Sequence, residues 1–281
     1  MPSFKRRRVA KRTQVHMKGL LMLIFVGVLI SVLTGFDFFL PVSRRSKVAR
    51  GKSTVQQSQT SFYAPILTYH HINPDLKPTP YNVTPKVFAE QMDWLADNDY
   101  HVISYDDFYH ATLGAAALPE NPVVITFDDG YRDQYEYAVP ILKSHNYSAM
   151  FYIYTHFTKA ADGMNWDMLR DLVKSGMEIG GHTASHAFLP ALQGKWLEYE
   201  LAGSKQTLEE HLGVPIQYFA YPGGSYTQAT IEALKQYGYS SAVTVLHDVI
   251  HSYYENSFTV PRIHIDNDVT SFVSSIRGEK L

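Results

Sequence analysis

The stretch Val123-Val-Ile-Thr-Phe-Asp-Asp-Gly130 joins a short apolar run to two adjacent carboxylates and a glycine. A run of β-branched and aromatic residues predicts a buried strand, and Asp128 and Asp129 follow directly at its carboxyl end. Neighbouring side chains of a strand point to opposite faces, so one carboxylate can bind a metal ion while the other accepts a proton. Asp-Asp-Gly is also ordinary turn sequence, which leaves a purely structural role open.

Two histidines follow another apolar segment about fifty residues further on, in Gly180-Gly-His-Thr-Ala-Ser-His-Ala-Phe188. His182 and His186 are four residues apart, so one helical turn would bring both imidazoles to the same side. Each histidine alone could be a surface or core residue. Together with one carboxylate from the end of the other predicted strand, they would form a three-ligand set for a catalytic divalent ion, with one position left for water.

The amino-terminal segment predicts membrane targeting. Residues 1–18 hold seven Lys or Arg and no acidic residue, and the segment from Gly19 to Gly35 carries no charge. Extended to Leu40, this apolar segment is at the lower limit for crossing a bilayer, so an uncleaved anchor and a signal peptide are both open. We favour an anchor over residues 19–40, because no small-x-small cleavage pattern follows it. The basic residues 1–18 would then stay in the cytoplasm, with the rest of the chain outside.

Residues 41–62 predict a flexible linker, since they are rich in Ser, Gln, Lys and Arg and lack apolar periodicity. The domain expected over residues 63–281 is acidic. Residues 1–52 hold 12 of the 25 basic residues and one acidic residue, which leaves 13 basic and 26 acidic residues beyond them. This charge argues against nucleic-acid binding but suits a polymer with free amines. The absence of cysteine excludes disulfides and thiolate metal ligands.

From residue 63 onward, short apolar strands alternate with amphipathic helices. We expect strands near 65–72, 123–127, 149–154, 177–179, 217–221, 241–245 and 258–264. We expect helices over 84–96, from 104, and over 134–144, 166–174, 196–212, 228–237 and from 270. This alternation predicts the α/β class, with a parallel sheet and helical crossovers. About seven such units, with both candidate motifs at carboxyl ends of strands, suit a barrel whose site lies at that face.

Thr126-Phe-Asp-Asp-Gly130 and His182-Thr-Ala-Ser-His186 resemble the first two motifs of the polysaccharide deacetylases, the family-four carbohydrate esterases with the NodB homology domain. The resemblance implies a distorted (β/α)7 barrel. It further implies that Asp129, His182 and His186 bind a divalent metal ion, expected to be Zn²⁺, which polarises water and the acetamide carbonyl. Asp128 would then be the general base.

A third family motif is altered in this sequence. Phe219-Ala-Tyr-Pro-Gly-Gly224 stands where the family often has Arg-x-Pro-Tyr, so Ala220 replaces the arginine and Gly223 the tyrosine. In the family, the amide after the proline helps to bind the oxyanion, and the N–H group of Gly223 can do the same. Tyr221 is expected to help position the substrate at this turn.

The altered motif lacks the arginine that orients the base. Arg262, in Val260-Pro-Arg-Ile-His264, is our candidate to replace it from a neighbouring strand. The alternative is an ordinary surface arginine.

Two histidines compete for the role of general acid. Leu246-His-Asp248 imitates the family's last motif, Leu-x-His, but it follows directly on the strand over 241–245, too early in the order of elements. Ile66-Leu-Thr-Tyr-His-His71 is a strand that ends in histidine, and in a closed barrel the first and last strands are neighbours. This order resembles the circularly permuted subgroup, which includes the biofilm deacetylases of the intercellular-adhesin type. It implies His70 rather than His247 as the acid, with His71 facing away; a core histidine is the alternative for His70.

The resemblance thus implies an N-deacetylase acting on an extracellular N-acetylglucosamine polymer, with poly-β-1,6-N-acetylglucosamine of a biofilm matrix as the preferred candidate. Peptidoglycan, chitin and a non-catalytic wall-associated carbohydrate-binding protein are the alternatives. The expected location is the cell membrane, single-pass with the domain outside, or else secreted and wall-associated. The 20 Tyr, 15 Phe and 3 Trp could supply platforms for sugar rings, but the sequence does not identify which of them do.

Overall fold

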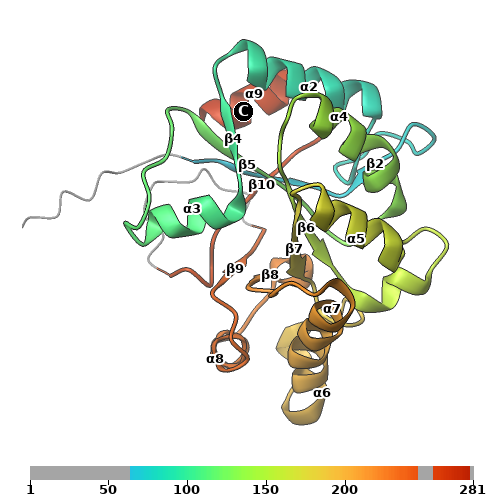
Figure 1. Ribbon diagram of the computed structural model, residues 1–281, viewed down its shortest axis with the longest axis vertical. Helices are drawn as coiled ribbons and strands as arrows, with labels where there is room; N and C mark the ends of the chain where they lie inside the picture. Colours follow the sequence, from blue (N-terminus) through green and yellow to red (C-terminus); the bar gives the residue numbers. More distant parts are fainter. Residues whose placement is uncertain (1–63, 246–255, 279–281) are drawn as a thin grey trace, which may run out of the picture. The chain divides into compact units, whose positions relative to one another are not determined.

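The computed structural model describes residues 64–245 and 256–278. Their main feature is a curled parallel sheet with strand order β10-β1-β5-β6-β7-β8-β9, in which β4 also pairs with β5 (Figure 1). This agrees with the predicted α/β barrel. The expected cytoplasmic segment 1–18, membrane segment 19–40 and linker 41–62 lie outside the described residues. Within those residues, no helix has the length and apolar character needed to cross a membrane.

The strands of the main sheet are short. They are β1 (Ile66–Tyr69), β4 (His101–Ile103), β5 (Pro122–Phe127), β6 (Met150–Ile153), β7 (Glu178–Gly181), β8 (Tyr218–Ala220), β9 (Ser241–Val243) and β10 (Ile263–His264). A separate two-stranded pair is formed by β2 (His71–Ile72) and β3 (Asn82–Val83). The strands β4 and β6 both pair with β5 on the side away from β1, β4 with its first half and β6 with its last residues.

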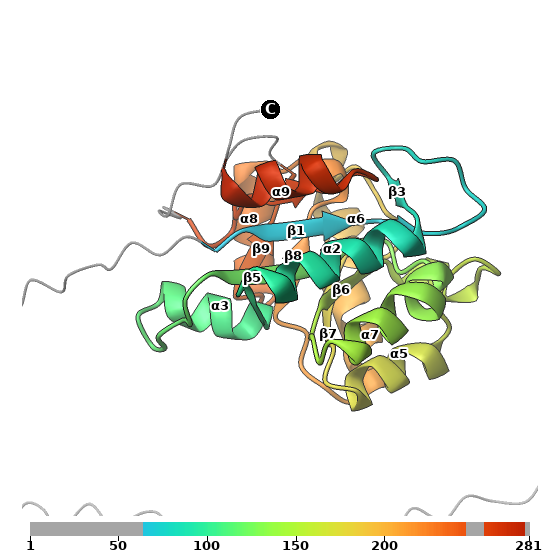
Figure 2. The same ribbon diagram turned by 90° about the horizontal axis from the view of Figure 1, so that it is seen from above.

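Helices pack around this sheet (Figure 1); most cover its outer face, whereas the helix over residues 105–112 places Tyr105 and Phe108 in the cluster inside the curl. They are α2 (Pro85–Asp97), α3 (Tyr105–Thr112), α4 (Val139–Ser144), α5 (Trp166–Lys174), α6 (Gly194–Glu198), α7 (Ser204–Leu212), α8 (Gln228–Gln236) and α9 (Val269–Arg277). Local sequence explains where several begin: the side chains of Thr84 and Ser104 cap α2 and α3, as expected. The helices α2 and α9 run along β1 (Figure 2), where Trp94 packs edge-on against Phe272.

The alternation of side chains along the strands creates two separate apolar layers. In β5, Val123, Ile125 and Phe127 pack in the larger cluster with the helices, whereas Val124 packs in the smaller cluster inside the curl. The same alternation holds in β1, with Leu67 and Tyr69 outside and Ile66 inside. The even-numbered positions of both strands therefore face the interior of the curl.

The two edges of the curled sheet are linked by the segment that leads into β10. Val243 of β9 forms a parallel bridge with Val260, and β10 then pairs with β1, so that Leu67 faces Ile263. The first and last strands are therefore neighbours, as the sequence predicted for a closed barrel.

Three sequence expectations need correction. The strand β4 was not expected, because its three residues lack a buried apolar run. The predicted strand 258–264 is reduced to a bridge at Val260 and the two residues of β10. The predicted helix 196–212 is divided into α6 and α7 by a wide, π-type turn over Tyr199–Gly203.

Candidate active site

The register between β1 and β5 sets the proposed acid and base side by side. Tyr69 pairs with Phe127 in the last row of this ladder, and the N–H group of Asp128 donates to the carbonyl oxygen of Tyr69 at 3.0 Å. His70 and Asp128 are the next residues of the two strands. Both are even-numbered positions, so their side chains continue the interior face of the curl.

Asp128 is held by a buried arginine. Arg262 donates from Nη1 to Oδ1 at 2.7 Å and from Nη2 to Oδ2 at 2.6 Å, and it also donates to Thr126 Oγ1 at 3.1 Å. Arg262 is fully buried, which excludes the alternative of a surface arginine. Burial alone would raise the pKa of Asp128, but the charge and hydrogen bonds of Arg262 outweigh it and lower the pKa. The two-point contact keeps the carboxylate ionised and fixes its orientation.

Asp129 faces the two histidines instead. Its Oδ1 atom lies 3.5 Å from Nε2 of His182 and 3.3 Å from Nε2 of His186. The backbone of Asp129 has a φ of 74°, a conformation that few residues other than glycine adopt. The next residue, Gly130, has a φ of 82°, and a Cβ atom there would lie 2.8 Å from Ile153 Cδ1. The motif therefore needs its glycine for space as well as for conformation.

His182 and His186 are not on a helical turn, contrary to the sequence expectation. His182 follows β7 directly, and the chain then reverses through positive φ values at Thr183 (70°) and His186 (60°). The two rings still meet, with centroids 5.0 Å apart. Buried Glu200 holds the turn by accepting hydrogen bonds from the N–H groups of Ala184 and Ser185, each at 2.9 Å. A tight loop, rather than helical periodicity, brings the histidines together.

These three side chains fit a divalent metal ion. One ligand atom from each of Asp129, His182 and His186 lies within 4.8 Å of the others, and Asp129 Oδ1 is buried without a hydrogen-bond partner among the described residues. Nδ1 of His182 lies 2.7 Å from the carbonyl oxygen of Ala220, which fixes the proton on Nδ1 and leaves Nε2 as a metal ligand. Ligand atoms of a tetrahedral zinc site are about 3.4 Å apart, close to the 3.3 and 3.5 Å found here.

His70 lies beside two other rings. Its ring centroid is 5.2 Å from His264 of β10 and 5.1 Å from Tyr81, and its Nδ1 atom is buried without a hydrogen-bond partner in the described part of the chain. Burial lowers the pKa of His70, while the charges of Asp128 and Asp129 act in the opposite direction. The imidazole therefore shares the electrostatic environment of the proposed base and metal ligands.

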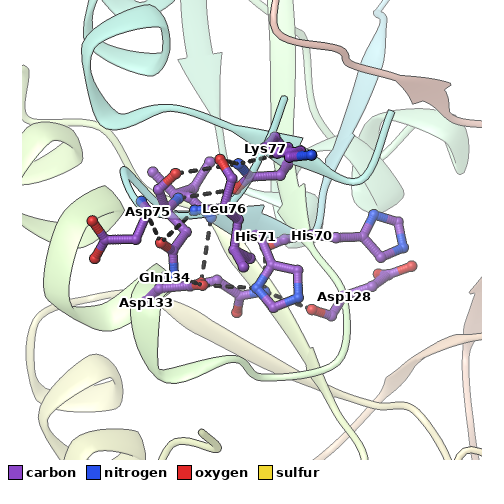
Figure 3. Close-up of polar contacts among 11 residues, drawn as sticks. His70, His71, Asp75, Leu76, Lys77, Asp128, Asp133 and Gln134 are labelled. Carbon is purple, nitrogen blue, oxygen red and sulfur yellow. Dashed lines mark hydrogen bonds and ion pairs between the residues drawn. The ribbon is translucent and has the colours of Figure 1, made fainter. Parts of the chain in front are cut away.

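His71 faces away from His70, as alternation predicts, and belongs to a supporting network (Figure 3). Nδ1 of His71 lies 2.7 Å from Oδ2 of Asp133, which also accepts from Asn73 Nδ2 at 3.0 Å. Gln134, which follows Asp133 in the chain, donates from Nε2 to the carbonyl oxygens of His70 at 2.7 Å and Asp128 at 2.6 Å. One buried amide thus ties together the strand ends that carry the proposed acid and base.

The altered third motif forms a tight turn. Gly223 and Gly224 have φ values of 61° and 68°, and the turn's hydrogen bonds run from Gly224 N to the Tyr221 carbonyl oxygen and from Ser225 N to the Pro222 carbonyl oxygen. Neither bond uses the N–H group of Gly223. Tyr221 is buried, and its hydroxyl donates to the carbonyl oxygen of Phe258 at 3.0 Å. That contact supports the turn, while direct contact of Tyr221 with substrate stays a prediction.

The structure therefore brings together Asp128, Asp129, His182, His186, His70 and Arg262, whereas His247 lies outside the described residues. Sequence reasoning missed His264, Glu200 and Gln134. His264 is two residues after Arg262, so strand alternation, which places both on one face, could have indicated His264. Glu200 is a charged residue at a buried position of the predicted helix 196–212, and this could have indicated its role. Nothing local distinguishes Gln134, because its two acceptors lie on separate strands.

Comparisons with known proteins agree with this geometry. A family model described as polysaccharide deacetylase matches residues 115–242. The chain is 29% identical over 180 residues to YxkH of Bacillus subtilis, covering 64% of this chain and 63% of that protein. It is 24% identical over 276 residues to the poly-β-1,6-N-acetyl-D-glucosamine N-deacetylase of Escherichia coli, covering 76% and 41%. The chain thus spans less than two thirds of either relative.

Among solved structures, the Streptococcus pyogenes deacetylase PplD in complex with acetate superposes with a TM-score of 0.71 at 25% identity. The match covers 77% of this chain and 99% of that one. The residues that the family model matches include Asp128, Asp129, His182 and His186. The chain therefore contains a polysaccharide deacetylase domain, which the family model places over residues 115–242.

Proposed function

We propose that this protein is a metal-dependent N-deacetylase that removes acetyl groups from an extracellular N-acetylglucosamine polymer. The observation that carries the proposal is the pairing of the Arg262–Asp128 contact with the Asp129-His182-His186 cluster at adjoining strand ends. The carboxylate of Asp128 is held ionised by a cation, while Oδ1 of Asp129 has no hydrogen-bond partner among the described residues and faces two imidazoles. A binding protein that kept a metal only for structure would have no use for the oriented carboxylate.

The chain's own groups divide the reaction between them. Asp129, His182 and His186 would hold the ion, expected to be Zn²⁺, which supplies a Lewis acid when bound. Asp128 accepts the proton of the attacking water, and Arg262 keeps its carboxylate aimed. The N–H group of Gly223 donates to the carbonyl oxygen as negative charge develops there. His70 gives a proton to the departing sugar amine, so that acetate and a free amine are formed.

The finer substrate assignment is poly-β-1,6-N-acetylglucosamine. It is supported by the similarity to the Escherichia coli enzyme with that name and by the position of β1 between β10 and β5, the strand order that the sequence led us to expect. Peptidoglycan and chitin are the competing polymers. The acidic composition of the domain suits a product that gains positive charge as acetyl groups leave.

Acetate release tests this function. The purified protein is offered β-1,6-linked N-acetylglucosamine oligomers, chitin oligomers and peptidoglycan, with and without a chelator. We expect release from the β-1,6-linked oligomers and its loss on chelation. His182→Ala should remove bound metal and activity together, whereas His145→Ala, a histidine that contacts Asp93 instead, should change neither. Full activity in chelator, or no acetate from any polymer by the metal-loaded protein, would contradict the proposal.

We also propose that residues 19–40 anchor the chain in the cell membrane, with the deacetylase domain outside. The support is the charge-free segment from Gly19 to Gly35 after the basic residues 1–18. A membrane anchor would keep the enzyme close to a polymer at the cell surface.

A further inference from the structure

Exposed aromatic side chains are candidate contacts for a sugar polymer, because the C–H faces of pyranose rings are apolar and pack on aromatic rings. The described residues include five such aromatic side chains: Tyr81, Phe188, Trp196, Tyr199 and Tyr226. Tyr81 stands out because its ring adjoins a proposed catalytic side chain. It meets the His70 ring edge-on, at 88° and a centroid distance of 5.1 Å, and lies 5.0 Å from His264. Yet 59% of Tyr81 remains exposed.

The loop that carries Tyr81 is held in place by hydrogen bonds. Buried Asn82 donates from Nδ2 to the carbonyl oxygens of Asn73 at 3.2 Å, Leu76 at 3.1 Å and Lys77 at 3.4 Å. The side chain of Asn73 in turn accepts from the N–H groups of Asp75 at 2.9 Å and Leu76 at 3.3 Å. Figure 3 shows this network beside His70. The loop is thus ordered without an apolar core of its own.

The same network joins the loop to the catalytic strands. The N–H group of His71 donates to the carbonyl oxygen of Tyr81 at 2.9 Å, and Asp133 binds both His71 and Asn73. The position of the Tyr81 ring is therefore set by the elements that set His70. A ring held in advance loses little conformational freedom when a ligand packs on it, which favours binding.

We propose that Tyr81 is a sugar-binding residue whose exposed ring face packs against a pyranose ring of the N-acetylglucosamine polymer. The proposal rests on the function proposed above, which supplies the ligand. His70 must approach the nitrogen of the unit that loses its acetyl group, so the polymer passes beside His70. Tyr81 is exposed and its ring adjoins His70, so it is placed to contact the sugar chain there.

Kinetics with the metal-loaded full chain test this contact. For a β-1,6-linked N-acetylglucosamine pentamer, Tyr81→Ala should raise KM by about two- to tenfold, with a smaller change in kcat. Tyr81→Phe and Tyr81→Trp should restore most of the affinity, because they keep an aromatic face. Leu113→Ala is the control. Leu113 is similarly exposed, but it lies in the connection that leads to the amino-terminal end of β5, whereas the site lies at the carboxyl ends of the strands, so the variant should behave as wild type.

Calorimetric binding of the same pentamer separates this inference from the proposed function. If wild type binds the pentamer and Tyr81→Ala binds it more weakly by the same factor, the contact holds even if no acetate is released. An unchanged KM and an unchanged dissociation constant would overturn the role of Tyr81. A lower kcat at unchanged KM would also overturn it, since Tyr81 would then act only through His70.

Discussion

Asp128 and Asp129 are adjacent in the chain but make different contacts. Asp128 faces Arg262, whereas Asp129 faces His182 and His186. Strand alternation, visible in the sequence, explains why they diverge. The positive φ of Asp129 adds a turn that alternation does not contain. Residue chemistry thus indicated a divided role for the two carboxylates, and the backbone conformation shows how Asp129 reaches its partners.

The general acid provides the test at this scale. His70→Ala should lower turnover by about 10²-fold or more with metal content intact, because His70 lies beside Asp128 through the β1–β5 register. His247→Ala should change turnover little. Side-by-side kinetics and metal analysis of the two variants check this, and the opposite ranking would remove His70 from the mechanism.

At the scale of elements, local signals predicted helices better than strand partners. The caps Thr84 and Ser104 mark the starts of α2 and α3 because a cap is a contact within one turn. The pairing of β10 with β1 joins segments almost two hundred residues apart, so it depends on the curl of the whole sheet. The burial of Arg262 beside the base could not be read from the sequence for the same reason.

The carboxylate of Glu178, which joins β7 to the start of α3, predicts that the stability of the protein depends on pH. Glu178 accepts hydrogen bonds from the N–H groups of Tyr105 at 2.7 Å and Asp106 at 3.0 Å, and burial raises its pKa from 4.5 to about 7. At pH values between 4.5 and about 7, Glu178 therefore keeps its proton in the folded chain but has lost it in the unfolded chain. The free energy of unfolding should therefore fall as pH rises from about 4.5 to 7, by on the order of 1 kcal/mol or more, and then level off.

Urea unfolding of wild type and Glu178→Gln across this pH range measures the effect. The difference between the two proteins should change with pH, because glutamine does not titrate, and any lost hydrogen bond adds only a constant offset. Glu232→Gln, on the exposed face of α8, serves as the control. Parallel curves for wild type and Glu178→Gln would contradict the prediction.

For the whole molecule, the family match over residues 115–242 leaves out β1 and β10. These two strands carry or adjoin His70 and Arg262, so the proposed acid and the partner of the base come from outside the matched segment. The site is complete only when both ends of the domain pack beside β5. Truncation at either end of the domain would therefore remove chemistry as well as stability.

The membrane prediction also belongs to the whole molecule. The intact chain should sediment with membranes, and protease added to whole cells should digest its domain, because the basic residues 1–18 favour a cytoplasmic amino terminus. A chain lacking residues 1–40 is the control and should stay in the supernatant. A secreted form that starts near residue 41 would show a cleaved signal peptide instead of an anchor.

Local sequence was enough to predict the alternation of strands and helices, the motifs around Asp128 and His182, and through them the polysaccharide deacetylase domain. These are local properties, because strand burial, capping and ligand chemistry depend on neighbouring residues. Three contacts became visible only in the folded chain: Arg262 holds Asp128, Gln134 joins the ends of β1 and β5, and Tyr81 adjoins His70. Arg262 and Asp128 are 134 positions apart, and such contacts exist only once the strands have paired around the curl.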